Sequence, residues 1–511
     1  MTRFGRWTLP ALAAGVLSVA HTAMAQTEAG DDAWRRRFEE LDRKVKVLEE
    51  KLERAERRAA GAEPAEPVAV PAPAAAAPDP SLQQRVDELE QQARITARKV
   101  EIDQEAAAQR AKDGPQAIAG RDGFGLRTAD NQFVLRLRGL IQVDARAYDS
   151  EVPGTAPDTF TLRRIRPTLE GTLFGKYGYR FTPDFGQGTT QIFDAYGDAN
   201  FHPAFKLRVG KFKPPVGLER LQSATALGFV ERSFPTNLVP TRDIGVQVAG
   251  EFFDTRLGYE VGAFNGVVDG GQGAGGSGDR DSNNGKDVAV RLFAHPFRNT
   301  DFYALSGLGI GVAATWGNQN GSATTSVLPT YLTPGQQTFF SYNAGAHADG
   351  ERTRLAPQFY WYWQQLGVLG EYNVNSQQVR RAGNLQDVET AAWQLALSWV
   401  VTGEDASFRG VTPRTNLDTA NGSWGAFEVV GRVGGQTVDD AAFTGSAATA
   451  LASLTTSSRK AQGYGLGLNW YWNRYVKVQF SYDQTSFERG AANGADRPDE
   501  RVFFTRYQVA F

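Results

Sequence analysis

Arginines recur at alternate positions in two segments of this chain, residues 133–148 and 159–173. In an extended strand, residues two apart lie on the same face, so this alternation gives one apolar face and one charged face. The charged face carries Arg136, Arg138, Gln142, Asp144 and Arg146 in the first segment, and Arg164, Arg166 and Thr168 in the second. A guanidinium group is permanently charged and donates paired hydrogen bonds to oxyanions. The chemistry indicated is anion binding along one face of a sheet.

Arg163 is out of phase with Arg164, which predicts a strand end or a β-bulge at this position. The same part of the chain also carries carboxylates that could pair with the arginines: Asp144, Glu170, Asp184, Asp194 and Asp198. Two interpretations therefore stay open. The surface either selects anions, which the composition favours, or carries mixed charge in which arginines and carboxylates neutralise each other.

The last eleven residues, 501–511, alternate apolar and polar side chains and end on an aromatic residue. Phe503, Tyr507, Val509 and Phe511 share one face, and Arg506 and Gln508 share the other. This ending is typical of a strand in an outer-membrane barrel, with one face toward lipid and one toward the lumen. We expect it to close the barrel against the first strand, with Arg506 and Gln508 facing the lumen beside Arg136 and Arg138.

The first 25 residues predict a secretory signal peptide. Arg3 and Arg6 precede an apolar run over 9–20, and Ala23-Met24-Ala25 forms a small-residue cleavage site. No later segment has eighteen consecutive apolar residues. A mature chain embedded in a membrane must therefore be a barrel, because only helices and closed barrels satisfy every backbone polar group in lipid.

Composition excludes several classes of function. The 511 residues contain no cysteine, which rules out disulfides, thiol catalysis and cysteine-ligated metals. The four histidines are far apart in the sequence, and the formal net charge of -2 argues against a nucleic-acid binder. No nucleophile, base and orienting group have usable spacing. We expect no enzyme activity, no cofactor, no metal and no nucleic-acid partner.

The segment after the signal predicts helices. Residues 26–60 contain a heptad with apolar positions Trp34, Phe38, Leu41, Val45, Leu48, Leu52 and Ala55, which favours a short parallel coiled coil over a single amphipathic helix. Residues 61–80 are Ala/Pro-rich and predict an extended linker. Residues 81–119 predict a second helical segment with a weaker apolar seam.

Residues 120–511 predict an all-β fold, a 16-stranded antiparallel transmembrane β-barrel preceded by the short periplasmic coiled coil. The expected strands start near residues 133, 159, 176, 190, 205, 243, 256, 286, 304, 351, 366, 388, 424, 461, 475 and 500. An even number suits a single-chain bacterial barrel. With a periplasmic amino terminus, the long segments 214–242, 266–285, 318–350 and 438–460 fall on the outer side.

The segment 214–242 is too long for a hairpin and too apolar to remain in water. Its apolar residues are Leu218, Leu221, Ala224, Ala226, Leu227, Phe229 and Val230. We expect it to fold into the lumen and narrow it. Its charged side chains would then act at the tightest point, where the low dielectric strengthens their fields.

Several motifs together resemble the phosphate-selective porin O and P family. They are Leu162-Arg163-Arg164, Phe193-Asp194-Ala195, the run 209–220, the run 230–233, Arg242-Asp243-Ile244-Gly245 and the run 262–266. The similarity covers about residues 120–511. The resemblance implies a sixteen-stranded trimeric barrel, in which lumen arginines lead to an anion site at an infolded third loop.

The resemblance also implies roles for individual residues. Arg163 and Arg164 match the family's arginine ladder, Asp194 matches the acidic partner of the central site, and Ser223 and Arg232 match a neighbouring serine and arginine. Arg220 stands where phosphate-specific members carry a lysine. Leu140, Arg166, Ala224 and Thr225 depart from the family pattern, and only Arg352 and Arg354 match its fifth-loop arginines. Anion transport is expected despite these departures, without strict orthophosphate specificity.

The sequence therefore predicts an outer-membrane homotrimer for passive diffusion of small, phosphate-like anions, embedded in lipid, with a periplasmic amino-terminal segment. Two alternatives remain open. One is a general-diffusion porin without phosphate specificity. The other is a barrel-anchored envelope tether, in which the coiled coil contacts the cell wall or another periplasmic partner.

Overall fold

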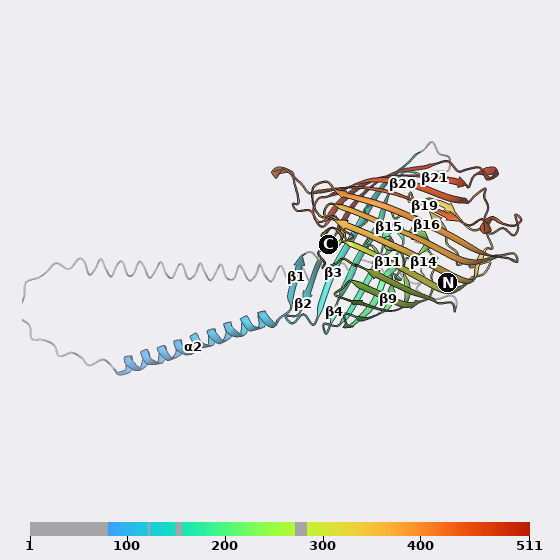
Figure 1. Cartoon of the computed structure of the whole chain (residues 1–511). Coiled ribbons are helices and arrows are strands. Elements are labelled where there is room, and N and C mark those ends of the chain that lie inside the picture. The colour runs from blue at the N-terminus through green and yellow to red at the C-terminus, as the bar shows by residue number, and fades with distance from the viewer. Residues whose placement is uncertain (1–79, 121–122, 150–155, 271–283) are drawn as a thin grey trace, which may run out of the picture. The chain divides into compact units, whose positions relative to one another are not determined.

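The computed structural model describes residues 80–120, 123–149, 156–270 and 284–511 (Figure 1). The predicted signal peptide, the coiled coil and residues 61–79 of the predicted linker lie outside the described residues. Helix α2 spans Pro80–Asp113 and begins at a proline, whose fixed φ suits the first turn of a helix. None of the described helices is both long enough and apolar enough to cross a membrane.

The main sheet is a closed antiparallel barrel of sixteen long strands, as predicted (Figure 1). These strands are β3 (Val134–Tyr148), β4 (Thr159–Leu173), β5 (Tyr177–Asp184), β6 (Gln191–His202), β7 (Phe205–Phe212), β8 (Asp243–Phe252), β9 (Leu257–Phe264), β10 (Asp287–Ala294), β11 (Leu308–Asn320), β14 (His347–Trp363), β15 (Leu366–Arg381), β16 (Asn384–Val400), β19 (Ala426–Val438), β20 (Ser458–Tyr471), β21 (Val476–Arg489) and β22 (Glu500–Ala510). Every strand starts within four residues of its predicted position, and the offset reaches four residues at Leu308, His347 and Asn384, which were predicted at 304, 351 and 388.

Short elements complete the described part of the chain. The remaining strands are β1 (Gln116–Gly120), β2 (Gly123–Arg127), β12 (Tyr331–Leu332), β13 (Thr338–Phe340), β17 (Leu417–Asp418) and β18 (Ser423–Trp424), and the short helix is α3 (Leu218–Leu221). The 3₁₀ turns are η1 (Gly186–Gly188), η2 (Phe234–Leu238), η3 (Tyr303–Leu305), η4 (Thr419–Asn421), η5 (Asp440–Phe443) and η6 (Ala492–Gly494).

The wall has the two faces that the alternation predicts. On β3, Leu135, Leu137 and Ile141 are exposed on the outside, whereas Gln142 and Asp144 are fully buried on the inside. Arg163 is a bulge residue: β3 pairs Gln142 with Arg164 and then Val143 with Leu162, so the pairing with β3 skips Arg163. The bulge predicted from the phase of Arg163 is confirmed. It brings both Arg163 and Arg164 to the buried face of β4.

The barrel closes by pairing β22 with β3, but the predicted neighbours of Arg506 and Gln508 are wrong. Arg506 lies opposite Asp144 and Gln508 opposite Gln142, not beside Arg136 and Arg138. Those two arginines lie on a part of β3 whose edge is occupied by β2, with Gly125 opposite Arg136. Because β2 of the β1–β2 hairpin pairs with the first residues of β3, β22 pairs with the later residues of that strand.

Phe511 lies at the junction between β22 and the β1–β2 hairpin. Its backbone N–H donates to the Gly139 carbonyl at 3.0 Å and its carbonyl accepts from the Gly139 N–H at 2.9 Å. The Phe511 ring packs edge-on against Phe124, with ring centroids 5.8 Å apart. The aromatic terminus therefore fixes the end of the barrel seam.

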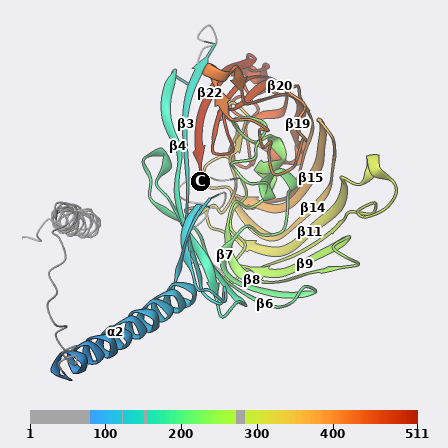
Figure 2. The ribbon, with the colours of Figure 1, turned by 90° about the vertical axis from the view of Figure 1, so that its left-hand side faces the viewer.

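The two ends of the barrel differ. At the end that contains Phe511, here called the turn end, most connections are short, such as 174–176, 203–204 and 472–475, although 401–425 is long. The opposite end, here called the loop end, carries long segments that include 213–242, here called loop 3. Figure 2 shows the green ribbon of loop 3 within the ring of strands. Phe234 and Leu238 of loop 3 pack there in a buried apolar cluster with Tyr331, Phe339 and Phe340.

A methyl group at Gly139 should disturb the seam. A Cβ built at this position would lie 2.5 Å from the Phe511 ring, closer than carbon atoms approach each other. We expect Gly139→Ala to displace Phe511 and to lower the free energy of unfolding by about 1–3 kcal/mol, the usual cost of overpacking. Urea titration of the protein refolded in lipid vesicles measures this change.

Gly431→Ala is the matched control, because its Cβ would meet only Leu466 at 3.7 Å, an ordinary contact. Equal unfolding free energies for the Gly139 and Gly431 variants would contradict the role assigned to Phe511.

Candidate functional site

Loop 3 is held inside the barrel by hydrogen bonds from wall side chains to its carbonyl groups. Gln142 on β3 donates to the Ala224 carbonyl at 3.2 Å, and Lys477 on β21 donates to the Leu227 carbonyl at 3.0 Å. Asn469 on β20 donates to the Gly228 carbonyl at 2.9 Å. Buried carbonyls are costly unless they accept hydrogen bonds, so these inward polar residues fix the path of the loop.

The start of loop 3 is held on the other side of the barrel through its amide groups. The N–H groups of Leu218 and Glu219 donate to the carboxylate of Glu371 on β15, at 2.7 and 3.2 Å. Gln394 on β16 donates to both Glu371 and Glu219. Loop 3 therefore crosses the lumen between β15–β16 and the β20–β3 side of the wall.

Glu231 is the main ionic anchor of loop 3. Arg163 donates to both of its carboxylate oxygens, and Arg506 reaches one of them at 3.3 Å. Arg146 and Arg164 lie within 3.3 and 3.7 Å. Burial raises the pKa of Glu231, but the surrounding guanidinium groups, with Arg163 the nearest, outweigh it and hold that pKa well below its usual range.

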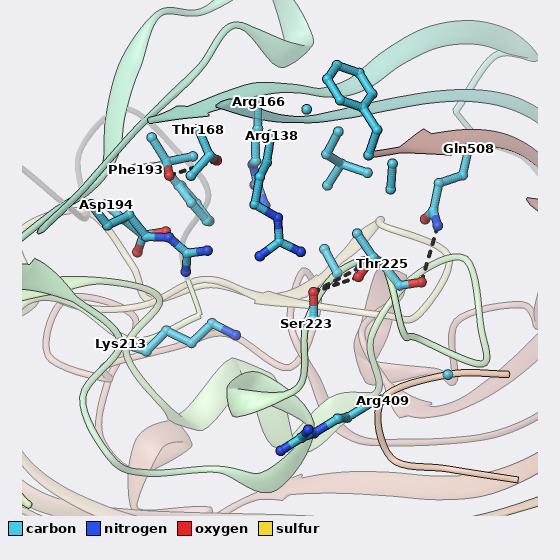
Figure 3. Close-up of a pocket in the computed structure, with 18 of the residues that line it drawn as sticks. Arg138, Arg166, Thr168, Phe193, Asp194, Lys213, Ser223, Thr225, Arg409 and Gln508 are labelled. Carbon is cyan, nitrogen blue, oxygen red and sulfur yellow. Dashed lines mark hydrogen bonds between the residues drawn. The ribbon is translucent and has the colours of Figure 1, made fainter. Parts of the chain in front are cut away.

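A cavity of about 740 Å³ lies between loop 3 and the turn end. Its lining includes Ser223 and Thr225 of the loop, Arg474 of a turn and the terminal Phe511. In Figure 3, Arg138 and Arg166 enter the cavity from the strands above, and Lys213 and Arg409 lie below. The cavity is therefore built by the wall, by loop 3 and by the long connection 401–425.

Basic side chains dominate this lining. They are Arg138, Arg166, Arg180, Arg208, Lys213, Arg242, Arg409, Arg474 and Lys477, against only Asp194 and Glu260 among the acidic residues. Several arginines pair with carboxylates at the edge of the cavity, through Glu170, Asp184 and Asp198. These five side-chain carboxylates are fewer than the nine basic side chains, so the side chains around the cavity carry an excess of positive charge.

Lys213 is the first residue of loop 3, and carbonyl groups of the same loop hold its side chain. Its ammonium group donates to the carbonyls of Leu221 and Gln222 at 3.0 and 2.9 Å. Burial, together with the guanidinium groups of Arg242 and Arg232, holds the pKa of Lys213 well below its usual range. An anion in the cavity would offset this repulsion and favour the charged form.

The family model described as phosphate-selective porin O and P matches residues 135–511. This chain belongs to that family. Porin O of Pseudomonas aeruginosa is 24% identical over 418 residues, which cover 77% of this chain and 92% of that protein. The protein is therefore an outer-membrane porin, and the family and the barrel fold point to a channel rather than an enzyme.

Solved structures with similar folds were also found. The outer-membrane channel DcaP of Acinetobacter baumannii has a TM-score of 0.48 and 14% identity, covering 76% of this chain and 99% of that one. An anion-selective porin from Comamonas acidovorans has a TM-score of 0.46 and 10% identity, covering 74% of this chain and all of that one (100%).

The structure brings some of the predicted site residues of this porin together and separates others. Arg138, Arg166, Asp194 and Ser223 line the large cavity, whereas Arg163 and Arg164 surround Glu231. Arg136 lies on β3 between Gly125 of β2 and Glu170 of β4.

The two remaining predicted residues, Arg220 and Arg232, form bonds within loop 3. Arg220 donates to the Thr236 carbonyl at 2.6 Å, and Arg232 donates to the Glu219 carbonyl at 3.0 Å. Neither lines the large cavity. Asp194 pairs with Arg242, at 2.6 Å.

Several cavity residues were not singled out from the sequence. Lys213 follows the end of β7, and Lys477 lies near the start of β21; neither belongs to a sequence motif. Arg409 lies in a connection of 25 residues at the turn end, 401–425. Of these three residues, only Lys477 could have been predicted to face the lumen, because it alternates with Gln479 on the same face of its strand. Within the described ranges, no group of three or more His, Asp or Glu side chains is placed to hold a metal ion.

Removal of the Glu231 charge should destabilise the barrel. In Glu231→Gln, the buried guanidinium groups of Arg163, Arg164 and Arg506 lose their shared carboxylate. Removing one partner of a buried ion pair typically lowers the free energy of unfolding by about 3–5 kcal/mol. We expect a loss of this size in the free energy of unfolding, measured by denaturant titration in vesicles.

Asp440→Asn provides the comparison, because the pair of Asp440 with Arg459 is 3.2 Å long and largely exposed. This variant should change the unfolding free energy by less than about 1 kcal/mol. A loss for Glu231→Gln no larger than this would show that Glu231 is not the anchor of loop 3.

Proposed function

We propose that this porin conducts small anions passively, with phosphate and related oxyanions as its main solutes, through an arginine-lined lumen that loop 3 narrows. The observation that carries the proposal is the excess of basic side chains over carboxylates in the cavity beside loop 3. A confined cavity of one sign of charge concentrates the opposite ion. The turn end would face the periplasm and the loop end the outside.

The residues predicted from the sequence divide into two roles in this proposal. Arg138, Arg166, Asp194 and Ser223 contact the passing anion, and Arg136 attracts it at the turn end. Arg163, Arg164, Arg220 and Arg232 hold loop 3 in position. The second group supports selectivity indirectly, since loss of the loop would widen the path and weaken every field inside it.

We also propose a homotrimer, which the family resemblance implies. The predicted coiled coil could hold three copies together, but its residues lie outside the described ones. Native mass measurement of the detergent-solubilised full chain tests this, and a monomer would contradict it.

Current measurements in a planar lipid bilayer test the anion selectivity. In a gradient of potassium chloride, the reversal potential of the wild-type porin should have the sign of an anion-selective pore. Arg138→Glu replaces one cavity cation by an anion and should move the reversal potential toward zero, because the excess positive charge falls by two.

Arg459→Glu controls for a change of charge remote from the cavity, since Arg459 pairs with Glu488 and Asp440 at the loop end. It should leave the reversal potential close to that of the wild type. A cation-selective wild-type pore would overturn the proposed function.

A further inference from the structure

Two buried arginines on β14 face the lumen near the loop end without lining the large cavity. Arg352 and Arg354 are two residues apart on the inward face of this strand, and only 2% and 4% of their surfaces are exposed. Neither is among the residues around the cavity of about 740 Å³. Positive charge in a lumen attracts anions, so the contacts of these two side chains determine whether they act on a passing ion.

Every nitrogen of the Arg354 guanidinium group already has an acceptor. Nε and Nη2 donate to the two carboxylate oxygens of Asp269, at 3.1 and 2.6 Å. Nη1 donates to Asp287 at 2.9 Å and to the hydroxyl group of Thr315 at 2.8 Å. Two parallel hydrogen bonds to one carboxylate are also the geometry in which a guanidinium group binds a free oxyanion. Asp269 therefore occupies the position that an anion from solution would take.

Arg352 and the second carboxylate complete a cluster whose charges cancel. Arg352 donates from Nη2 to Asp287 at 2.7 Å. Neutral side chains support both acids, since Asn375 donates to Asp269 and Gln319 donates to Asp287. Around the large cavity, by contrast, basic side chains outnumber carboxylates. The four charged residues, here called the arginine clasp, are Arg352, Arg354, Asp269 and Asp287.

Asp269 does not belong to the wall but to a short segment, residues 265–270, that follows β9 at the loop end. Near the start of this segment, two backbone N–H groups donate to Asp243 at 2.7 and 3.1 Å. Near its end, Asp269 forms an antiparallel bridge with Pro240 of loop 3. The backbone thus holds the Asp269 carboxylate beside Arg354. A tethered group competes with a free ion at a high effective concentration.

We propose that Asp269 and Asp287 are selectivity-determining residues, which act as built-in counter-ions and remove Arg352 and Arg354 from the anion path. The inference goes beyond the proposed anion conduction and rests on it. Selectivity is then determined by the basic side chains of the large cavity, where the excess of positive charge lies. The clasp lowers the attraction for anions in the loop-end half of the lumen, which limits binding there and favours passage.

Removal of one carboxylate tests the inference through a gain of selectivity. In Asp269→Asn, the clasp carries one net positive charge, and Arg354 loses its charged acceptor. The permeability ratio of chloride to potassium is obtained from the reversal potential of the full-length porin in a planar bilayer. We expect this ratio to rise roughly threefold, because one unit of charge acts with opposite sign on the anion and the cation. An unchanged or lower ratio in the folded variant overturns the proposal.

A neutral variant is measured as well, because removal of one partner of a buried ion pair can prevent folding. Asp269→Asn combined with Arg354→Gln removes one charge of each sign and keeps the side chains similar in size. If the clasp lies outside the anion path, this double variant should keep the permeability ratio of the wild type. A ratio that falls toward one would show that Arg354 acts on passing anions, which overturns the proposal. Heat-modifiable mobility on a gel verifies that each barrel is folded.

The wild-type porin provides a further measurement that does not depend on a folded variant. Phenylglyoxal, which modifies accessible arginines, is applied to the intact porin in vesicles, and the modified positions are found by peptide mass mapping. Arg409, which is exposed and lines the large cavity, should react readily, whereas Arg354 should stay unmodified. Modification of Arg354 at the rate of Arg409 would mean that the clasp is open, and the proposal fails.

Asp349→Asn is the matched control for Asp269→Asn. Asp349 lies near the loop end of the same strand, β14, and pairs with Arg380, but the two side chains are 37% and 40% exposed. Water and salt screen such a pair, so loss of the same charge should leave the permeability ratio at its wild-type value. A rise as large as that of Asp269→Asn would assign the effect to the overall charge of the protein and overturn the role of the clasp.

The outcomes separate the two proposals. If the wild type is cation-selective, the proposed function fails and the inference fails with it. If the wild type is anion-selective, but Asp269→Asn does not raise the permeability ratio or the double variant lowers it, the inference alone is overturned.

Discussion

The arrangement of the lumen depends on the hydrogen bonds that hold loop 3 inside it. A chain segment within a barrel leaves water, so its carbonyls and amides require partners from the wall. Here Gln142, Asn469 and Lys477 donate to the loop carbonyls, and Glu371 accepts from its amides. The alternation of β-strands supplies such partners at every second residue. The position of the loop then determines which wall arginines remain around the cavity and which are used to hold Glu231.

The distribution of charge follows from the same constraint. Around Glu231, four arginines share two carboxylates, Glu231 itself and Asp144. Uncompensated charge in a low-dielectric interior is unfavourable, so these arginines are retained at a cost in stability. In the cavity, five arginines pair with carboxylates: Arg138, Arg166, Arg180, Arg208 and Arg242. The excess of positive charge there comes mainly from the other basic side chains, Lys213, Arg409, Arg474 and Lys477. A pore that paired all of its cations with carboxylates would lose the excess of positive charge on which the proposed anion conduction depends.

The sequence was sufficient for the wall and insufficient for the site. Strand period placed Gln142 and Asp144 inside and Leu137 outside, and the phase break at Arg163 predicted its bulge, because side-chain direction in a strand depends only on local spacing. The pairing of Arg506 was misplaced because it depends on β2, a strand outside the alternating pattern. The pairing of Asp194 with Arg242, and the insertion of Arg409, depend on how long connections fold back. Such connections have no regular residue spacing, so the direction of their side chains cannot be predicted from the sequence.

Conduction places an upper limit on how tightly the lumen can hold an anion. An ion must be attracted strongly enough to enter and weakly enough to leave. A guanidinium group donates at most two parallel hydrogen bonds to one oxyanion, and its other N–H groups point elsewhere. Asp184 and Asp194 each occupy one nitrogen of an arginine, Arg166 and Arg242, and lower the local charge without removing the remaining donors. These carboxylates, which at first suggest a neutral lumen, therefore lower the positive charge and still leave both arginines with further donors. The ring of Phe193 lies against both guanidinium groups.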